Sequence, residues 1–226
     1  MVIRLSQAEH ARVSAAVAEA ERRTSGEIAV VVAEDSDRYH DAVLHWAILA
    51  MFLALAALAL LPAETFHSWL SLLSGWQTKT ASHRLILAGL FLLLGSLFLA
   101  VRYAVGLTRL RYRLVPAATK TRRVRRRAIG HFRVGTERRT AGRTGVLIYV
   151  SLAEHRAEIV ADAAIHGKVP PEAWGAAMTA LIGHVKADRT ADGLVEAIGQ
   201  VGALLAAHFP PSEANPNEVP DRLVEI

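Results

Sequence analysis

Two long apolar segments near the middle of the chain constrain its fold most. The first, Val43 to Leu61, and the second, Leu85 to Val101, contain no formally charged residue. At a rise of about 1.5 Å per residue, each segment approaches the length that a helix needs to cross the hydrocarbon core of a bilayer. Arg102 can extend its side chain toward the headgroups, so that Tyr103 to Leu107 completes the second crossing. The sequence therefore predicts a transmembrane hairpin over residues 43–107.

The alternative is a pair of helices buried in the core of a soluble protein. Soluble helices usually carry polar residues at a 3.6-residue period, whereas both segments are apolar on all sides. Two such segments next to each other favour the membrane interpretation. The connector between them, Glu64 to His83, spaces its Trp and Leu residues like an amphipathic helix at headgroup depth.

The distribution of basic residues predicts the orientation of this hairpin. Only Lys79 and Arg84 lie in or next to the connector. Eleven basic residues lie within about twenty positions of the outer ends of the two segments, where they mark the cytoplasmic side: Arg23, Arg38, Arg109, Arg111, Arg113, Lys120, Arg122, Arg123, Arg125, Arg126 and Arg127. We therefore expect a multi-pass protein of the bacterial inner membrane with both termini in the cytoplasm.

Length and composition leave room for one further domain. The chain has 226 residues, of which 52% are hydrophobic, so a domain of about 130 residues can accompany the hairpin. The formal net charge of +5 is unevenly distributed, because residues 102–143 carry fourteen of the 26 Lys and Arg residues and a single acid, Glu137. The absence of cysteine excludes disulfides, iron–sulfur clusters and thiol catalysis.

The remaining sequence alternates helix and strand patterns. Ser6 and Glu9 form a capping-box pattern for a helix to Arg23, and the basic segment after the hairpin continues as helix to about Gly142. Continuous β-branched or apolar runs predict buried strands, and Pro170 and Thr190 begin two further helices. The expected elements are strands at Glu27–Ala33, Gly145–Leu152 and Ala157–Asp162, and helices at 170–183 and 190–208.

These patterns predict one α/β domain split by the hairpin. The expected parts are 1–42 as the first part of the domain, 43–107 as the hairpin, 108–127 as a basic juxtamembrane segment, and 128–211 as the second part of the domain. Residues 212–226 are rich in Pro, Asn and Glu, and we expect them to form a disordered tail.

Several motifs, taken in this order, resemble the TPM domain family, also called the Psb32-type domain. They are Thr24 to Val32, His131-Phe132, Arg143 to Leu152 with Glu154, Arg156 and Asp162, and the terminal helix from Leu194 to Phe209. The resemblance covers roughly residues 5–38 and 120–210. It implies a Rossmann-like α/β/α sandwich, membrane tethering, and a role in maintaining or regulating membrane protein complexes. Acid phosphatase activity and calcium binding have also been attributed to members of this family.

Carboxylates at strand ends provide the chemical grouping that the sequence suggests. Asp35, Asp37 and Asp162, with His166 or Asp188, offer oxygen and nitrogen ligands for calcium or magnesium if they converge at one edge of the sheet. The alternative is that these residues are solvated turn acids and a helix-capping aspartate. The sequence has no glycine-rich phosphate loop, no Gly-x-Ser-x-Gly elbow and no His-Glu-x-x-His motif that would specify a hydrolase.

A run of arginines follows the second apolar segment. Arg122, Arg123, Arg125, Arg126 and Arg127 are predicted to face anionic lipid headgroups, each contributing about 1 kcal/mol of attraction near the surface. Binding to nucleic acid phosphates is the alternative, but the run lacks the interleaved aromatic residues that stack on bases. Its position close to an apolar segment favours lipid.

The sequence thus favours a non-catalytic accessory or regulatory factor for membrane protein complexes, which presents a TPM-like domain at the cytoplasmic membrane face. The partner is expected to be a membrane protein that the sequence does not identify. The rival function is a divalent-metal-dependent acid phosphatase that uses Asp35, Asp37 and Asp162, and a basic-patch nucleic-acid binder is the third alternative.

Overall fold

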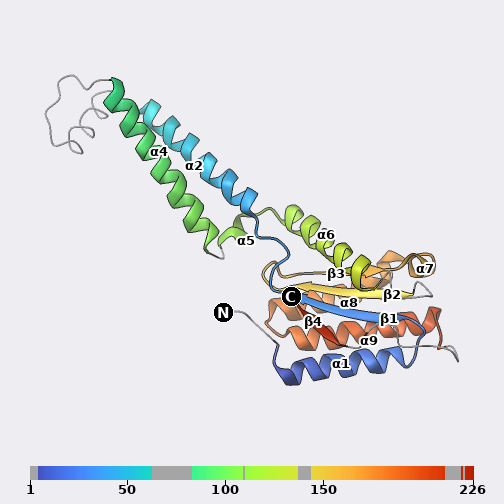
Figure 1. Cartoon of the computed structure of the whole chain (residues 1–226). Helices are drawn as coiled ribbons and strands as arrows, with labels where there is room; N and C mark the ends of the chain where they lie inside the picture. Colours follow the sequence, from blue (N-terminus) through green and yellow to red (C-terminus); the bar gives the residue numbers. More distant parts are fainter. Residues whose placement is uncertain (1–4, 63–82, 109, 137–143, 212–219, 221) are drawn as a thin grey trace. The chain divides into compact units, whose positions relative to one another are not determined.

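The structure is a computed structural model that describes residues 5–62, 83–108, 110–136, 144–211, 220 and 222–226. The chain forms two compact units (Figure 1). One, the α/β unit, combines Met1–Arg38 with Ala117–Ile226, and the other, the helical unit, consists of Tyr39–Pro116. The helical unit therefore interrupts the α/β unit in the sequence.

The α/β unit contains a four-stranded sheet in the order β3-β2-β1-β4. Its strands are β1 (Glu27–Ala33), β2 (Gly145–Ser151), β3 (Arg156–Ala161) and β4 (Leu223–Glu225). The first and second strands pair in parallel, with Glu27 opposite Gly145 and Ala33 opposite Ser151. The fourth strand is parallel to β1, and the third is antiparallel to β2. The three strands predicted from sequence are confirmed, to within one residue at each end.

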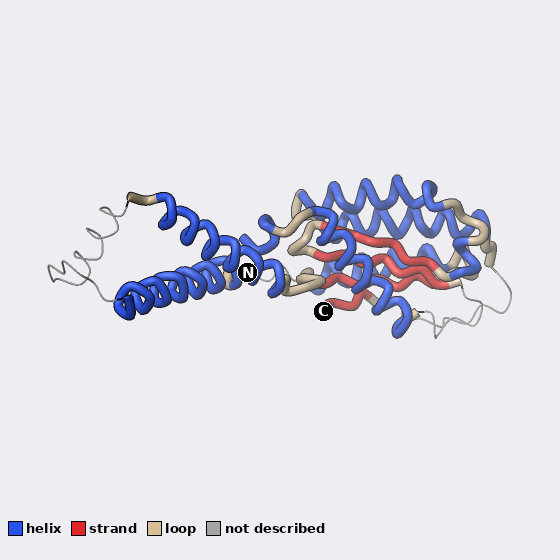
Figure 2. Tube along the Cα trace, turned by 90° about the horizontal axis from the view of Figure 1, so that it is seen from above, coloured by secondary structure: helices blue, strands red, loops and turns tan. Residues whose placement is uncertain are grey.

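Helices cover both faces of this sheet (Figures 1 and 2). On one face, α1 (Gln7–Glu21), α8 (Gly175–Lys186) and α9 (Thr190–His208) pack on Val30, Val32 and Ile148. On the other face, α6 (Ala117–Gly135) packs on Val31 and Tyr149. Successive strand residues point to opposite faces, so a continuous apolar run is the pattern that a sheet covered on both sides requires. Two short helices, α7 (Ala163–His166) and η1 (Pro171–Trp174), connect β3 to α8.

The prediction of a disordered tail is wrong for Leu223–Glu225, because these residues form β4 beside β1. The Glu225 carboxylate accepts a hydrogen bond from the Leu5 amide (3.0 Å) and lies 3.2 Å from His10 Nε2. The tail is polar in overall composition, but its apolar pair Leu223-Val224 lies beside β1 and covers an edge of that buried strand. Residues 212–219 and 221 lie outside the described part of the chain.

The predicted juxtamembrane segment, 108–127, is not one structural piece. Its first half contains α5 (Leu110–Leu114) of the helical unit, and its second half is the start of α6 in the α/β unit. Val124, Ala128 and Phe132, which repeat every four residues among the arginines, are buried under this helix. This period is the apolar stripe of an amphipathic helix, and it packs α6 onto the sheet.

The helical unit consists mainly of two antiparallel apolar helices, α2 (His40–Leu60) and α4 (His83–Gly106). Both could cross a membrane by length and composition, with mean hydropathies of 2.4 and 2.1 in their most apolar parts, of which 11% and 0% of residues are buried. A helix is predicted for the connector Glu64–His83, but residues 63–82 lie outside the described part of the chain. Near the ends of the unit, the Trp46 indole donates a hydrogen bond to the Leu114 carbonyl (3.3 Å), and the Tyr39 and Tyr112 rings meet edge to face with centroids 5.9 Å apart.

Helix α9 offers a matched test of packing in the α/β unit. A Cβ atom added at Gly202 would lie 2.7 Å from Ala20 Cβ on α1, whereas one added at Gly199 meets no atom within 4 Å. We predict that Gly202→Ala lowers the free energy of unfolding by about 1–3 kcal/mol through overpacking. Gly199→Ala is expected to raise it by up to about 1 kcal/mol through helix propensity. Denaturant unfolding followed by circular dichroism checks both values, and equal effects of the two variants would contradict the close approach of α1 and α9.

Candidate functional site

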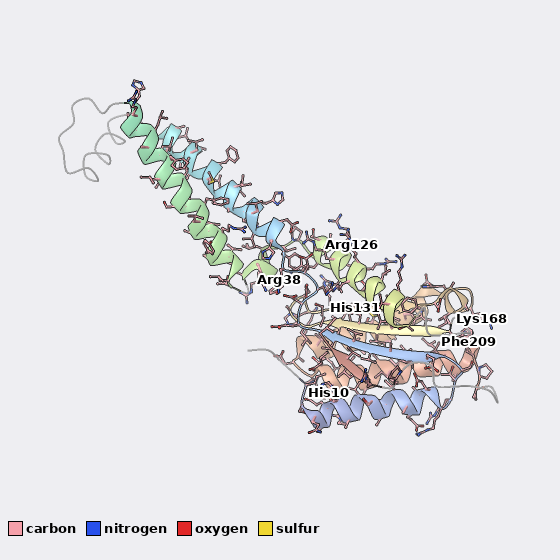
Figure 3. The ribbon with its side chains drawn as sticks, in the orientation of Figure 1. His10, Arg38, Arg126, His131, Lys168 and Phe209 are labelled. Atoms are coloured by element: carbon pink, nitrogen blue, oxygen red, sulfur yellow. The ribbon has the colours of Figure 1, made fainter. Side chains whose placement is uncertain are left out.

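A pocket of about 560 Å³ lies between α6 and the loop that follows β1. The loop contributes Ser36 and Asp37. One side of α6 contributes the remaining wall, which consists of Arg123, Arg126, Arg127, Gly130, His131 and Val134. Both parts belong to the α/β unit, and Figure 3 labels Arg126 and His131 along α6. The pocket is therefore an open basic hollow at the carboxyl end of β1.

A buried carboxylate holds the loop side of the pocket. Glu154, which is only 5% exposed, accepts hydrogen bonds from the Ser36 amide (3.0 Å) and from the Ser151 hydroxyl. The Ser36 hydroxyl is 3.0 Å from the Tyr149 hydroxyl at the centre of the sheet. Because β2 supplies both Ser151 and Tyr149, the sheet fixes where the loop places the pocket-lining Ser36 and Asp37.

His131 connects α6 to this network through ring contact. Its imidazole stacks on the buried Tyr149 ring, with centroids 5.8 Å apart and planes 17° from parallel. Burial lowers the pKa of His131 below its ordinary value, and the nearby Arg127 guanidinium lowers it further. Burial likewise raises the pKa of Tyr149. The His131 ring lines the pocket, and its Nε2 atom is buried and makes no hydrogen bond within the described part of the chain.

Cations outnumber anions among the pocket-lining residues. An Arg123 guanidinium nitrogen lies 3.0 Å from an Asp37 carboxylate oxygen, and their side chains are 21% and 38% exposed. Arg126 and Arg127 are exposed at the pocket wall. Counting only the lining side chains, with His131 neutral, three guanidinium groups face one carboxylate, which leaves two positive charges; the buried carboxylate of Glu154 is not part of the lining. An arrangement of this kind attracts and orients anions, because guanidinium groups form charge-assisted hydrogen bonds with oxyanions.

The predicted metal ligands are not brought together. Asp35 and Asp37 follow the carboxyl end of β1, whereas Asp162 follows β3, which runs in the opposite direction. The Asp162 amide donates to the Gly145 carbonyl (2.9 Å) at the start of β2. The length of a seven-residue strand, about 20 Å, therefore separates Asp162 from the other two aspartates.

Asp162 instead performs the alternative role that the sequence suggested, since it is the N-cap of α7 and accepts a hydrogen bond from the Ala163 amide (3.0 Å). His166 is exposed on α7, and Asp188 is exposed between α8 and α9. Among the described residues, no group of three or more His, Asp or Glu side chains is arranged to hold a metal ion. The predicted calcium or magnesium site loses its ligand set, and the metal-dependent phosphatase loses the residues proposed for it.

The five arginines predicted to face lipid divide into two groups. Arg123, Arg126 and Arg127 line the pocket, whereas Arg122 and Arg125 are exposed on α6 and do not. Burial raises the pKa of Glu158 on β3, and the charges of Arg125 and Arg156 partly oppose this effect. The five arginines thus do not form a single face of α6: three line the pocket, and Arg125 lies near Glu158 instead.

Sequence reasoning did not assign a role to His131 in this site. The signal was present in the spacing, because Arg123, Arg127 and His131 repeat every four residues and therefore share one side of a helix. The contributions of Ser36 and Glu154 depend on how β1 and β2 end, which spacing along the chain does not reveal.

Comparisons with known proteins show a likeness of fold. No protein-family model matches the chain, and no curated protein matches it. A solved structure, that of the BA42 protein from the psychrophilic bacterium Bizionia argentinensis, is similar with a TM-score of 0.55 and 19% sequence identity. The match covers 98% of this chain and 95% of that protein. The similarity supports the mixed α/β fold and carries no information on activity.

The environment of His131 gives a measurable expectation. We predict a pKa below 6.5 for this histidine in the folded protein, and a higher value in Arg127→Gln, because the variant removes a positive charge that opposes protonation. The value in the variant should stay below 6.5, since burial is the larger cause. Histidine ring NMR titration measures both, with Arg122→Gln as a control that removes the same charge outside the pocket.

The same shift predicts a direction for stability. As the pH falls, His131 takes up a proton in the unfolded chain at a higher pH than in the folded chain, and this favours unfolding. The contribution of His131 to the free energy of unfolding is therefore complete above pH 6.5 and is lost as the pH falls below that value. A His131 that titrates at or above 6.5 in the folded protein would contradict both expectations.

Proposed function

We propose that this chain is an integral membrane protein of the bacterial inner membrane, anchored by α2 and α4 as a transmembrane hairpin. One observation carries the proposal: the two helices leave their apolar side chains exposed. Among the described residues, all large apolar side chains that are exposed lie in the helical unit except Val134, Val224 and Ile226. A soluble protein would bury such helices, since contiguous exposed apolar surface is unfavourable in water. Lipid is the solvent that suits them.

The charge pattern supports a cytoplasmic location for the α/β unit. Arg23, Arg38 and the arginines of α5 and α6 flank the outer ends of the hairpin, while Lys79 and Arg84 lie at the connector side. In this proposal both halves of the α/β unit lie in the cytoplasm, and the exposed arginines of α6 contact anionic headgroups. The motifs that resemble the TPM family favour a Rossmann-like member of that family.

The same resemblance favours an accessory role over catalysis. We propose that the α/β unit acts as a non-catalytic accessory or regulatory factor that contacts a membrane protein. The exposed surface of α6 supports this choice, because it combines five exposed arginines with Val134, whose side chain is 74% exposed next to the pocket. Apolar residues within a charged surface are typical of transient protein interfaces.

The natural absence of cysteine makes the topology directly testable. Single cysteines at Ala8 on α1 and Ala203 on α9, both exposed, report on the two halves of the α/β unit, and Ser74→Cys reports on the connector. We expect a membrane-impermeant maleimide to label Ser74→Cys in intact spheroplasts. It should label Ala8→Cys and Ala203→Cys only after lysis or in inverted vesicles.

The cysteine-free parent chain is the control for background labelling. Labelling of Ala8→Cys or Ala203→Cys from outside would overturn the proposed orientation. Recovery of the chain in the soluble fraction after carbonate washing, without detergent, would overturn the membrane anchor itself.

The accessory role predicts a protein neighbour at α6. A photo-crosslinking amino acid at Val134 is expected to capture a defined membrane protein in native membranes, because this side chain is exposed within the proposed contact surface. The same amino acid at Ala203, exposed on the opposite face of the sheet, is the matched control and should not capture that protein. Capture of lipid alone at Val134, or the same proteins at both positions, would contradict the accessory role.

A further inference from the structure

We infer that the pocket beside α6 is a binding site for a doubly charged phosphate group, either inorganic phosphate or the phosphomonoester headgroup of a lipid. Arg123, Arg126 and Arg127 provide the positive charge, and the His131 ring forms part of the wall. The pocket lies entirely within the α/β unit. The inference goes beyond the proposed accessory role and does not depend on whether the hairpin crosses a membrane.

The charge of the site matches a dianion. Asp37 neutralises one of the three guanidinium groups, that of Arg123, at 3.0 Å, and the Arg123 side chain is 21% exposed. Arg126 and Arg127 then leave two positive charges at the wall. A phosphomonoester carries about −1.5 to −2 at neutral pH and offers three acceptor oxygens. A carboxylate ligand would satisfy one guanidinium, as Asp37 does, and leave the second without an anion.

The spacing along the helix suits a tetrahedral group. Residues three and four positions apart on a helix are neighbours, so Arg126 and Arg127 lie one turn from Arg123 on the same side. Three guanidinium groups gathered in this way repel one another, and a shared oxyanion relieves the repulsion. The adjacent side of α6 consists of Val124, Ala128 and Phe132, which are buried against the sheet. The arginines therefore lie on the remaining sides of the helix.

The site is hollow as well as basic. Gly130 lies in the wall one turn before Val134, and a Cβ atom added there meets no atom of the described residues within 4 Å. A larger side chain at this position would therefore occupy the pocket without displacing the core.

Two double variants test whether phosphate binds in this pocket or is attracted by the positive charge of α6 in general. Arg126→Gln/Arg127→Gln and Arg122→Gln/Arg125→Gln remove the same charge from exposed positions of the same helix, but only the first pair lines the pocket. Gly130→Leu fills the pocket without changing charge. We expect the full-length chain in phosphatidylcholine nanodiscs to bind inorganic phosphate saturably at constant ionic strength, measured by equilibrium dialysis with radiolabelled phosphate. Arg126→Gln/Arg127→Gln and Gly130→Leu should each weaken binding by about tenfold or more, and Arg122→Gln/Arg125→Gln by less than about threefold.

A second arm distinguishes the source of the phosphate group. Nanodiscs that contain phosphatidic acid are compared with nanodiscs that contain phosphatidylserine, whose phosphodiester has no dianionic state, by ³¹P NMR of the headgroups. A pocket-dependent shift of the phosphatidic acid signal assigns a lipid source, whereas binding of inorganic phosphate alone assigns a soluble one. The inference is overturned if neither probe binds saturably, or if the two double variants weaken binding equally while circular dichroism shows both to be folded.

Discussion

The parallel pairing of β1 with β2 is the constraint on which the rest of the structure depends. Their register, from Glu27 opposite Gly145 to Ala33 opposite Ser151, joins two segments that lie more than a hundred residues apart. The Glu27 amide donates to the Thr144 carbonyl (3.1 Å), and the Thr144 hydroxyl donates to the Ser25 carbonyl (3.1 Å), which fixes where the pairing begins. At the other end, the Leu152 amide donates to the Ala33 carbonyl (3.0 Å). The faces for α1, α9 and α6, and the loop that carries Ser36, all follow from this register.

A parallel pair needs a crossover, and here the crossover contains an entire second unit. Closing a flexible loop of that length would cost on the order of 4 kcal/mol in chain entropy. The helical unit reduces this cost because its own two ends meet. A Cβ atom added at Gly106 would lie 3.8 Å from Val43, and Trp46 reaches the Leu114 carbonyl near the end of the unit. When the two ends of an inserted unit are adjacent, the entropy cost of closing the connection is that of a short loop. Domain insertion is tolerated under this condition.

The sequence predicts well those elements whose structure depends on residues close to one another in the chain, and it predicts poorly those that depend on distant residues. The capping box of α1 involves neighbours only, and the Ser6 hydroxyl does accept from the Glu9 amide (3.3 Å) while Glu9 accepts from the Ser6 amide (2.7 Å). The apolar strands were equally evident from their composition. The strand β4 was missed because three residues carry little pattern of their own and are stabilised by an edge supplied elsewhere in the chain. The sequence groups Asp162 with Asp35 and Asp37 because all three follow predicted strands, but β3 runs antiparallel to β2, which places Asp162 at the opposite end of the strands.

The pocket likewise combines residues that the sequence places together with residues that only the fold brings close. Its arginines share a helix side that the four-residue spacing reveals, but their neighbour Asp37 comes from a loop that Glu154 and Tyr149 hold in place. Helix α6 therefore serves two structural purposes with adjacent stripes: one stripe covers the sheet, and the other gathers charge over the end of β1. A run of arginines tethered only to a membrane would remain extended and solvated. Because Val124, Ala128 and Phe132 pack on the sheet, α6 instead holds the backbone positions of these arginines fixed relative to one another, and positions on a rigid element are what selective recognition of an anion requires.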